Sequence, residues 1–85
     1  MINVKTAIDK AKKHLMAFFP EAENVQLEEV ELTNDKTHWL ITLSYEGVSA
    51  SVASSLLVGK SVIYKQFKLD AESGEVIAMK IRDIK

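Results

Sequence analysis

Apolar and polar residues alternate most clearly in the last third of the chain, residues 62–84, which predicts two antiparallel strands joined by a short turn. The residues on the face predicted to be buried are Ile63, Phe67 and Leu69 in the first strand and Ile77, Met79 and Ile81 in the second. This period of two is typical of a sheet with one buried side. The opposite face, predicted to be exposed to solvent, carries Tyr64, Gln66, Lys68, Lys80 and Arg82.

The turn between these strands, residues 70–75, contains residues suited to a tight hairpin. The carboxylate of Asp70 can accept backbone N–H groups two or three residues further on. Gly74 can adopt the positive φ that closes a loop of four or five residues. We therefore expect a hairpin here.

A helix is predicted near the N-terminus by apolar residues that recur every three or four positions. They are Val4, Ala7, Ile8, Ala11, Leu15, Phe18 and Phe19. Asn3 can cap the first turn through its side-chain oxygen, and Pro20 ends the helix because it disfavours helical geometry at Phe19. The opposite, lysine-rich side could bind an anion or a membrane surface, but membrane-binding helices usually have a larger apolar face and a stronger net positive charge, so we interpret it as a solvated face.

Two further strands are predicted between residues 25 and 45. Val25 and Leu27 alternate with polar residues, and after two consecutive glutamates the alternation resumes on the other parity, which indicates a β-bulge at Glu28 and Glu29. A turn follows at Asn34–Asp35. The second strand contains the alternating residues Trp39, Ile41, Leu43 and Tyr45. Leu40 interrupts its polar face, either as a lone exposed residue or as part of a contact patch.

The segment 47–59, GVSASVASSLLVG, carries no charge and shows no clear period. An unstructured loop of that length is unusual in so small a domain, so we expect either an extension of the flanking strands into a long arm or a mobile segment that binds a partner. Leu56, Leu57 and Val58 could equally cover one end of the core.

Together these elements predict a single α+β domain over residues 1–85. One N-terminal helix is expected to pack on one face of a three- to four-stranded antiparallel meander sheet. In that core we expect Leu15, Phe18, Leu43, Phe67, Ile77 and Ile81 to be buried together.

Composition narrows the class of protein. The chain has 85 residues, 47% of them hydrophobic, no cysteine and a formal net charge of −1. Disulfides and thiolate metal sites are therefore absent, and the charge does not suggest a nucleic-acid binder. No apolar run approaches a membrane span or a leader peptide. The chain as given is expected to be cytoplasmic, although export of a longer precursor stays open.

The candidates for catalysis are few. His14 and His38 are the side chains whose ordinary pKa lies near neutrality, but neither belongs to a recognisable motif. Glu28, Glu29 and Glu31 are close in sequence, yet neighbours on a strand point to opposite faces, so we expect no acid pair from them. There is no phosphate-binding glycine loop and no nucleophile elbow. We expect no cofactor, no metal and no enzyme activity.

Charge is distributed unevenly along the chain. Between Glu21 and Glu46 there are seven acidic residues and one basic residue, whereas from Lys60 onward there are six basic and four acidic residues. In a meander the acidic strand and the basic last strand would form opposite edges. This polarity could steer a partner, favour edge-to-edge self-association, or protect the edges from unwanted pairing.

The segment YKQFKLDAESGEVIAM, with its Asp70-Ala71 and Ser73-Gly74-Glu75-Val76 turn, resembles the PepSY domain and its relatives. The early helix with Ala7, Ile8 and Ala11 and the strand Trp39–Tyr45 agree with that resemblance. It implies a helix packed on an antiparallel sheet, in an inhibitory or regulatory binding module without catalytic residues. A broader cystatin-like α+β fold is the alternative, and a fold alone does not fix function.

We therefore expect a non-catalytic protein-interaction or regulatory module that binds a protein partner or a second copy of itself. The candidate interaction residues are Val52, Leu56, Leu57, Val58, Tyr64, Lys68, Lys80 and Arg82. In this hypothesis Leu56→Asp with Leu57→Asp would convert a dimer to a monomer. The alternative is a small-ligand or peptide-binding domain in which residues 47–59 close over the wedge between helix and sheet, near Trp39 and Phe67.

Overall fold

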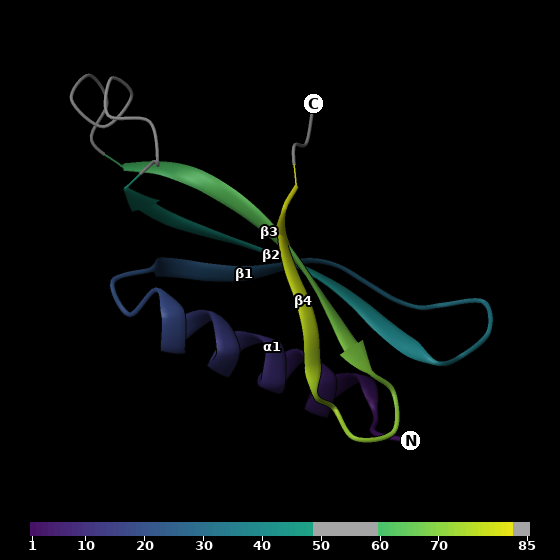
Figure 1. Cartoon of the computed structure of the whole chain (residues 1–85). Coiled ribbons are helices and arrows are strands. Elements are labelled where there is room, and N and C mark those ends of the chain that lie inside the picture. The colour runs from purple at the N-terminus through teal and green to yellow at the C-terminus, as the bar shows by residue number, and fades with distance from the viewer. Residues whose placement is uncertain (49–59, 83–85) are drawn as a thin grey trace.

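The computed structural model describes residues 1–48 and 60–82, and it shows one helix on one side of an antiparallel sheet (Figure 1). The elements are α1 (Val4–Phe18), β1 (Glu23–Leu32), β2 (His38–Val48), β3 (Lys60–Asp70) and β4 (Val76–Ile81). The four strands lie in the order β1-β2-β3-β4, and each pairs antiparallel with its neighbour. The predicted α+β fold and meander are confirmed.

Helix α1 begins and ends where its sequence predicts. The Asn3 side chain accepts a hydrogen bond from the Thr6 backbone N–H at 2.8 Å, and satisfies one free donor of the first turn. At the other end the Phe19 N–H donates to the Leu15 carbonyl at 2.8 Å, and Pro20 follows. Within the described residues no helix is long and apolar enough to cross a membrane.

The core lies between α1 and the inner face of the sheet. Its buried residues are Ala7, Ala11 and Leu15 of α1, Ile41, Leu43 and Tyr45 of β2, and Phe67 and Leu69 of β3. The two alanines let the helix backbone approach the sheet closely, because they add little side-chain thickness to the contact. The prediction that Leu15, Leu43 and Phe67 share the core is confirmed.

Three residues predicted to belong to this core are exposed, and for them the prediction was wrong. Phe18, Ile77 and Ile81 have relative exposures of 62%, 53% and 69%. The chain leaves the helix after Phe18, and it is Phe19 that packs on the Tyr45 ring, with centroids 5.8 Å apart.

The exposure of the two isoleucines follows from the path of β4. Leu69 pairs with Val76 and Lys68 with Ala78, so Ile77 is an extra residue in an irregular register. Ile81 pairs with Lys65 on β3, but β4 is the edge strand, so no strand covers the outer side of Ile81. An extra residue therefore shifts the alternation that the sequence alone suggests.

An aspartate holds each of the two described turns that join paired strands. In the β3–β4 turn, Asp70 accepts from the backbone N–H groups of Glu72 and Ser73, each at 2.9 Å, and Gly74 has a φ of 77°. These bonds lower the pKa of Asp70. In the β1–β2 turn, hydrogen bonds from Thr33 and Thr37 lower the pKa of Asp35 to about 2. The predicted hairpin and both turn positions are confirmed.

The segment predicted as an arm or partner-binding loop is described only at its ends. Strands β2 and β3 continue as far as the pair Val48 and Lys60, so the flanking strands extend into the segment. Residues 49–59, and with them Val52, Leu56, Leu57 and Val58, lie outside the described residues.

Truncation of the central core residue tests this arrangement. Leu43 is 0% exposed, so Leu43→Ala is expected to lower the free energy of unfolding by about 2–5 kcal/mol. Ile77→Ala is the matched control. Substitution of this exposed residue is expected to change the free energy of unfolding by about 0.5 kcal/mol or less. Urea unfolding of both variants gives the comparison, and equal losses would contradict the faces assigned here.

Candidate functional site

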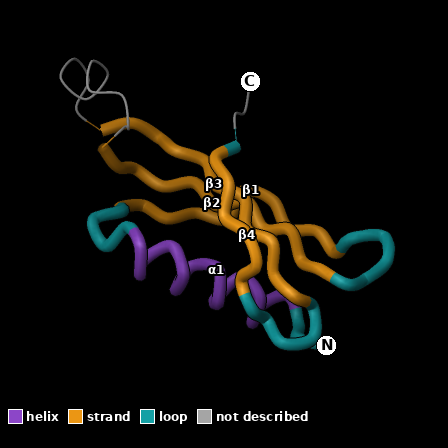
Figure 2. Tube along the Cα trace, viewed as in Figure 1, coloured by secondary structure: helices purple, strands orange, loops and turns teal. Residues whose placement is uncertain are grey.

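The face of the sheet opposite α1 is not covered by any other described element (Figure 2). We call it the open face. Its residues alternate with those of the core, so that Gln66 and Lys68 point away from the helix where Phe67 and Leu69 point toward it. The side chains that form the open face are Gln26, Glu28, Glu29 and Glu31 of β1, Leu40, Thr42, Ser44 and Glu46 of β2, Val62, Tyr64, Gln66 and Lys68 of β3, and Ala78, Lys80 and Arg82 at β4.

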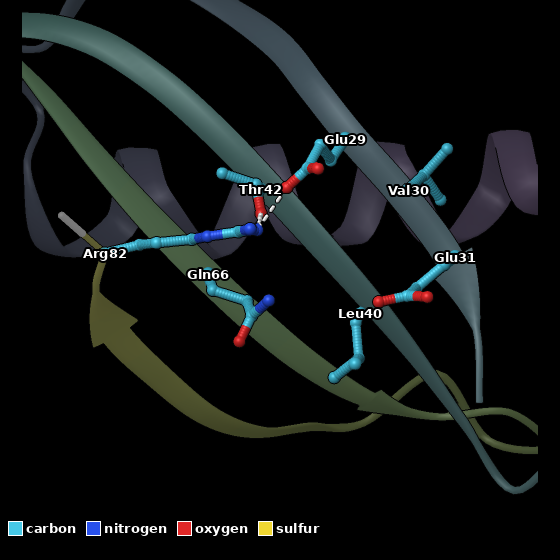
Figure 3. Close-up of a pocket in the computed structure, with 7 residues that line it drawn as sticks. All are labelled: Glu29, Val30, Glu31, Leu40, Thr42, Gln66 and Arg82. Atoms are coloured by element: carbon cyan, nitrogen blue, oxygen red, sulfur yellow. Dashed lines mark hydrogen bonds and ion pairs between the residues drawn. The ribbon is translucent and has the colours of Figure 1, made fainter. Parts of the chain in front are cut away.

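A shallow hollow lies near the middle of the open face (Figure 3). It is lined by Glu29, Val30, Glu31, Leu40, Thr42, Gln66 and Arg82. In Figure 3 the Arg82 side chain runs from the end of β4 across β3 toward Thr42 and Glu29, with α1 behind the sheet. One side chain therefore spans the sheet from its last strand to its first.

Arg82 is fixed through both its backbone and its guanidinium group. Its backbone N–H donates to the Tyr64 carbonyl at 2.9 Å, and its Nη1 donates to Thr42 Oγ1 at 2.9 Å and forms an ion pair with Glu29. Thr42 is 1% exposed, so Arg82 supplies the hydrogen bond that a buried hydroxyl requires. The planar guanidinium suits this role because it presents several donors in a fixed arrangement.

The predicted bulge in β1 places two glutamates on the open face together. Leu27 pairs with Leu43 and Glu29 with Thr42, so Glu28 is the extra residue, and the bulge is confirmed. Glu28 accepts a hydrogen bond from Ser44 Oγ at 2.7 Å, while Glu29 contacts Arg82. The expectation that these neighbouring carboxylates point to opposite faces was therefore wrong, because the bulge interrupts strict alternation.

A second hollow lies near the end of β2 and the start of β3. It is lined by Asn24, Gln26, Glu28, Ser44, Tyr45, Glu46, Val62 and Tyr64. The Asn24 side-chain amide donates to Glu46, and Asn24 itself has a positive φ of 52° at an irregular point of β1. Val62 is 56% exposed, so this hollow has an apolar rim.

The open face is divided by charge. Its carboxylates, on β1 and β2, form what we call the acidic half: Glu28, Glu29, Glu31 and Glu46. Its cations, on β3 and β4, form the basic half: Lys68, Lys80 and Arg82. Asp70 ends β3, but its carboxylate is engaged by the turn backbone. The charge polarity along the sequence thus becomes a polarity across one surface.

The two histidines lie away from the open-face hollows. The His14 ring lies tilted against the Phe18 ring, with centroids 4.9 Å apart, and meets the Phe67 ring edge-on at 6.1 Å, so it packs at the margin of the core. His38 Nδ1 lies 2.7 Å from Thr37 Oγ1 beside the β1–β2 turn. Among residues 1–48 and 60–82, no three His, Asp or Glu side chains cluster in a way that could hold a metal ion.

Half of the interaction residues predicted from the sequence can be placed. Tyr64, Lys68, Lys80 and Arg82 all lie on the open face, and the structure brings Arg82 together with Glu29 and Thr42. Sequence reasoning missed the contribution of Glu28, Glu29, Thr42 and Ser44. The signal that could have identified the two glutamates was the bulge itself.

No family model, no curated protein and no solved structure matches this chain.

The contact between Arg82 and Glu29 can be tested by a double-mutant cycle with Arg82→Ala and Glu29→Ala. Both side chains are partly exposed, so a coupling energy of about 0.2–1 kcal/mol is expected from urea unfolding of dilute protein. A control cycle pairs Glu29→Ala with Lys12→Ala on α1, for which no coupling is expected. Equal coupling in the two cycles would contradict the contact.

Proposed function

We propose that this chain is a non-catalytic protein-interaction module whose binding surface is the open face. The observation that carries the proposal is a whole face of a four-stranded sheet that no other element of residues 1–48 and 60–82 covers. Antiparallel sheets commonly leave one face in water, so exposure alone does not indicate binding. Here the exposed face also has half-buried Leu40 and Tyr64 near its middle and charges of both signs around them.

The shape and chemistry of the open face suit a protein better than a small molecule. Small-molecule pockets are concave and mostly apolar, and they enclose most of the ligand. The two hollows here are open and are lined largely by polar side chains, and the hydroxyls of Thr42 and Ser44 already have partners. Protein interfaces, in contrast, are broad and combine an apolar centre with a polar rim.

The PepSY-like hairpin supports the same proposal from the sequence. It suggests an inhibitory or regulatory role, in which the module acts by occupying a surface of its partner. A regulator of this kind needs no catalytic group of its own.

The alternative is a ligand-binding wedge between helix and sheet near Trp39 and Phe67. One observation favours it, because Trp39 Nε1 is buried and has no hydrogen-bond partner within the described residues. Against it, Ala11, Phe67 and Leu69 are each 0% exposed, so protein side chains fill the region between α1 and β3. The open face therefore remains the preferred binding surface.

A photo-crosslinking residue placed at Gln66, in the middle of the open face, tests the proposal in the cells that make the protein. A protein adduct is expected at this position and is expected to be lost when Lys68→Glu and Lys80→Glu are added. The control places the same crosslinker at Lys13, on the exposed side of α1, where no adduct is expected.

Two results would contradict the proposal. One is the absence of an adduct at Gln66 when the protein is abundant and folded by circular dichroism. The other is an adduct of equal yield at Lys13, because it would indicate contact without preference for the open face.

A further inference from the structure

We propose that the partner of the open face is a second copy of this chain, docked face to face about a twofold axis that runs parallel to the strands between β2 and β3. This inference rests on the proposed function, since it names the occupant of the same surface. A twofold interface requires a patch that is complementary to itself. The open face meets that requirement through its division into an acidic and a basic half.

The direction of the axis follows from the order of the strands. Rotation about an axis parallel to the strands places β1 and β2 of one copy over β4 and β3 of the other, so opposite charges meet twice. Rotation about an axis across the strands would place β1 over β1, with carboxylates facing carboxylates. Like charges brought together in an interface oppose association, so the charge pattern selects the first arrangement.

The distribution of uncharged residues fits this arrangement as well. The strands next to the axis carry the uncharged residues Leu40, Thr42, Ser44, Val62, Tyr64 and Gln66, and their two charged residues, Glu46 and Lys68, lie nearer the strand ends. The outer strands carry most of the charges, with Glu28, Glu29 and Glu31 on β1 and Lys80 and Arg82 at β4. Depletion of charge at the centre with a charged rim is typical of protein interfaces.

Some of these charges have no ion-pair partner in the part of one copy that the structure describes. Arg82 already pairs with Glu29, but among the described residues no ion pair involves Glu31, Lys68 or Lys80. Glu31 and Lys80 lie on opposite edge strands, separated by three strand spacings, or about 14 Å. In the proposed dimer, the acidic edge of each copy would lie over the basic edge of the other.

A charge-exchange experiment tests the dimer. The first variant carries Lys68→Glu and Lys80→Glu, and the second carries Glu28→Lys and Glu31→Lys. The wild-type protein is expected to dimerise in analytical ultracentrifugation, with weaker association in 1 M NaCl because salt screens the rim charges. Each variant alone is expected to show a dissociation constant raised about 100-fold or more. An equimolar mixture of the two variants is expected to restore the dimer.

Two controls accompany this experiment. Lys5→Glu with Lys13→Glu changes the net charge as the first variant does, but on exposed positions of α1, and is expected to leave dimerisation unchanged. Carbodiimide coupling of mixed ¹⁴N- and ¹⁵N-labelled wild-type protein is expected to join Glu31 to Lys80 or Lys68 between heavy and light chains.

The results separate this inference from the proposed function. A wild-type protein that is monomeric at about 1 mM overturns the dimer, whereas a Gln66 adduct with a different protein would still support the open face as a binding surface. Open-ended oligomers would overturn the twofold arrangement in favour of edge pairing between β1 and β4. Failure of the mixture to associate, with both variants folded, also overturns it.

Discussion

The packing of one 15-residue helix against one face of a four-stranded sheet is the constraint on which the rest of the structure depends. Leu15, Leu43 and Phe67 are buried in the apolar core. Burial of one apolar side chain of this size stabilises the folded state by about 1.5–3 kcal/mol. Ala7 and Ala11 let α1 lie close to the sheet. No second layer covers the other face among residues 1–48 and 60–82, so within this part of the chain the buried polar groups of that face need hydrogen-bond partners on the same face.

The open face meets this requirement through contacts between strands. Arg82 donates to Thr42, and Ser44 donates to Glu28, so two nearly buried hydroxyls have hydrogen-bond partners within the sheet itself. Both contacts depend on side chains that remain partly exposed, which keeps charged groups at the surface. The same side chains that satisfy the sheet are therefore available to a partner, and this links the stability of the fold to its proposed function.

Much of the fold could be predicted because it is encoded locally. The Asn3 cap, the Asp70–Gly74 turn and the bulge at Glu28 are each set by neighbouring residues, and all three are present. The burial of Ile77 was predicted wrongly, because the irregular register of β4 changes which residues face inward.

The candidate site was harder to predict for a related reason. Arg82 and Thr42 are 40 positions apart and meet only after three strands have paired, so no local pattern indicates their contact. The charge division of the open face was visible as a polarity along the sequence, but its placement on one surface required the strand order and the bulge in β1.

The most direct test of the central claim, that the open face buries itself against a second copy, is a dilution series followed by ¹H–¹⁵N NMR. Between about 1 mM and 10 μM, concentration-dependent shifts are expected at open-face positions such as Leu40, Tyr64 and Gln66, while Lys5, Asp9 and Lys13 on α1 stay unchanged. Shifts concentrated on α1, or spectra that do not change with concentration, would contradict the account.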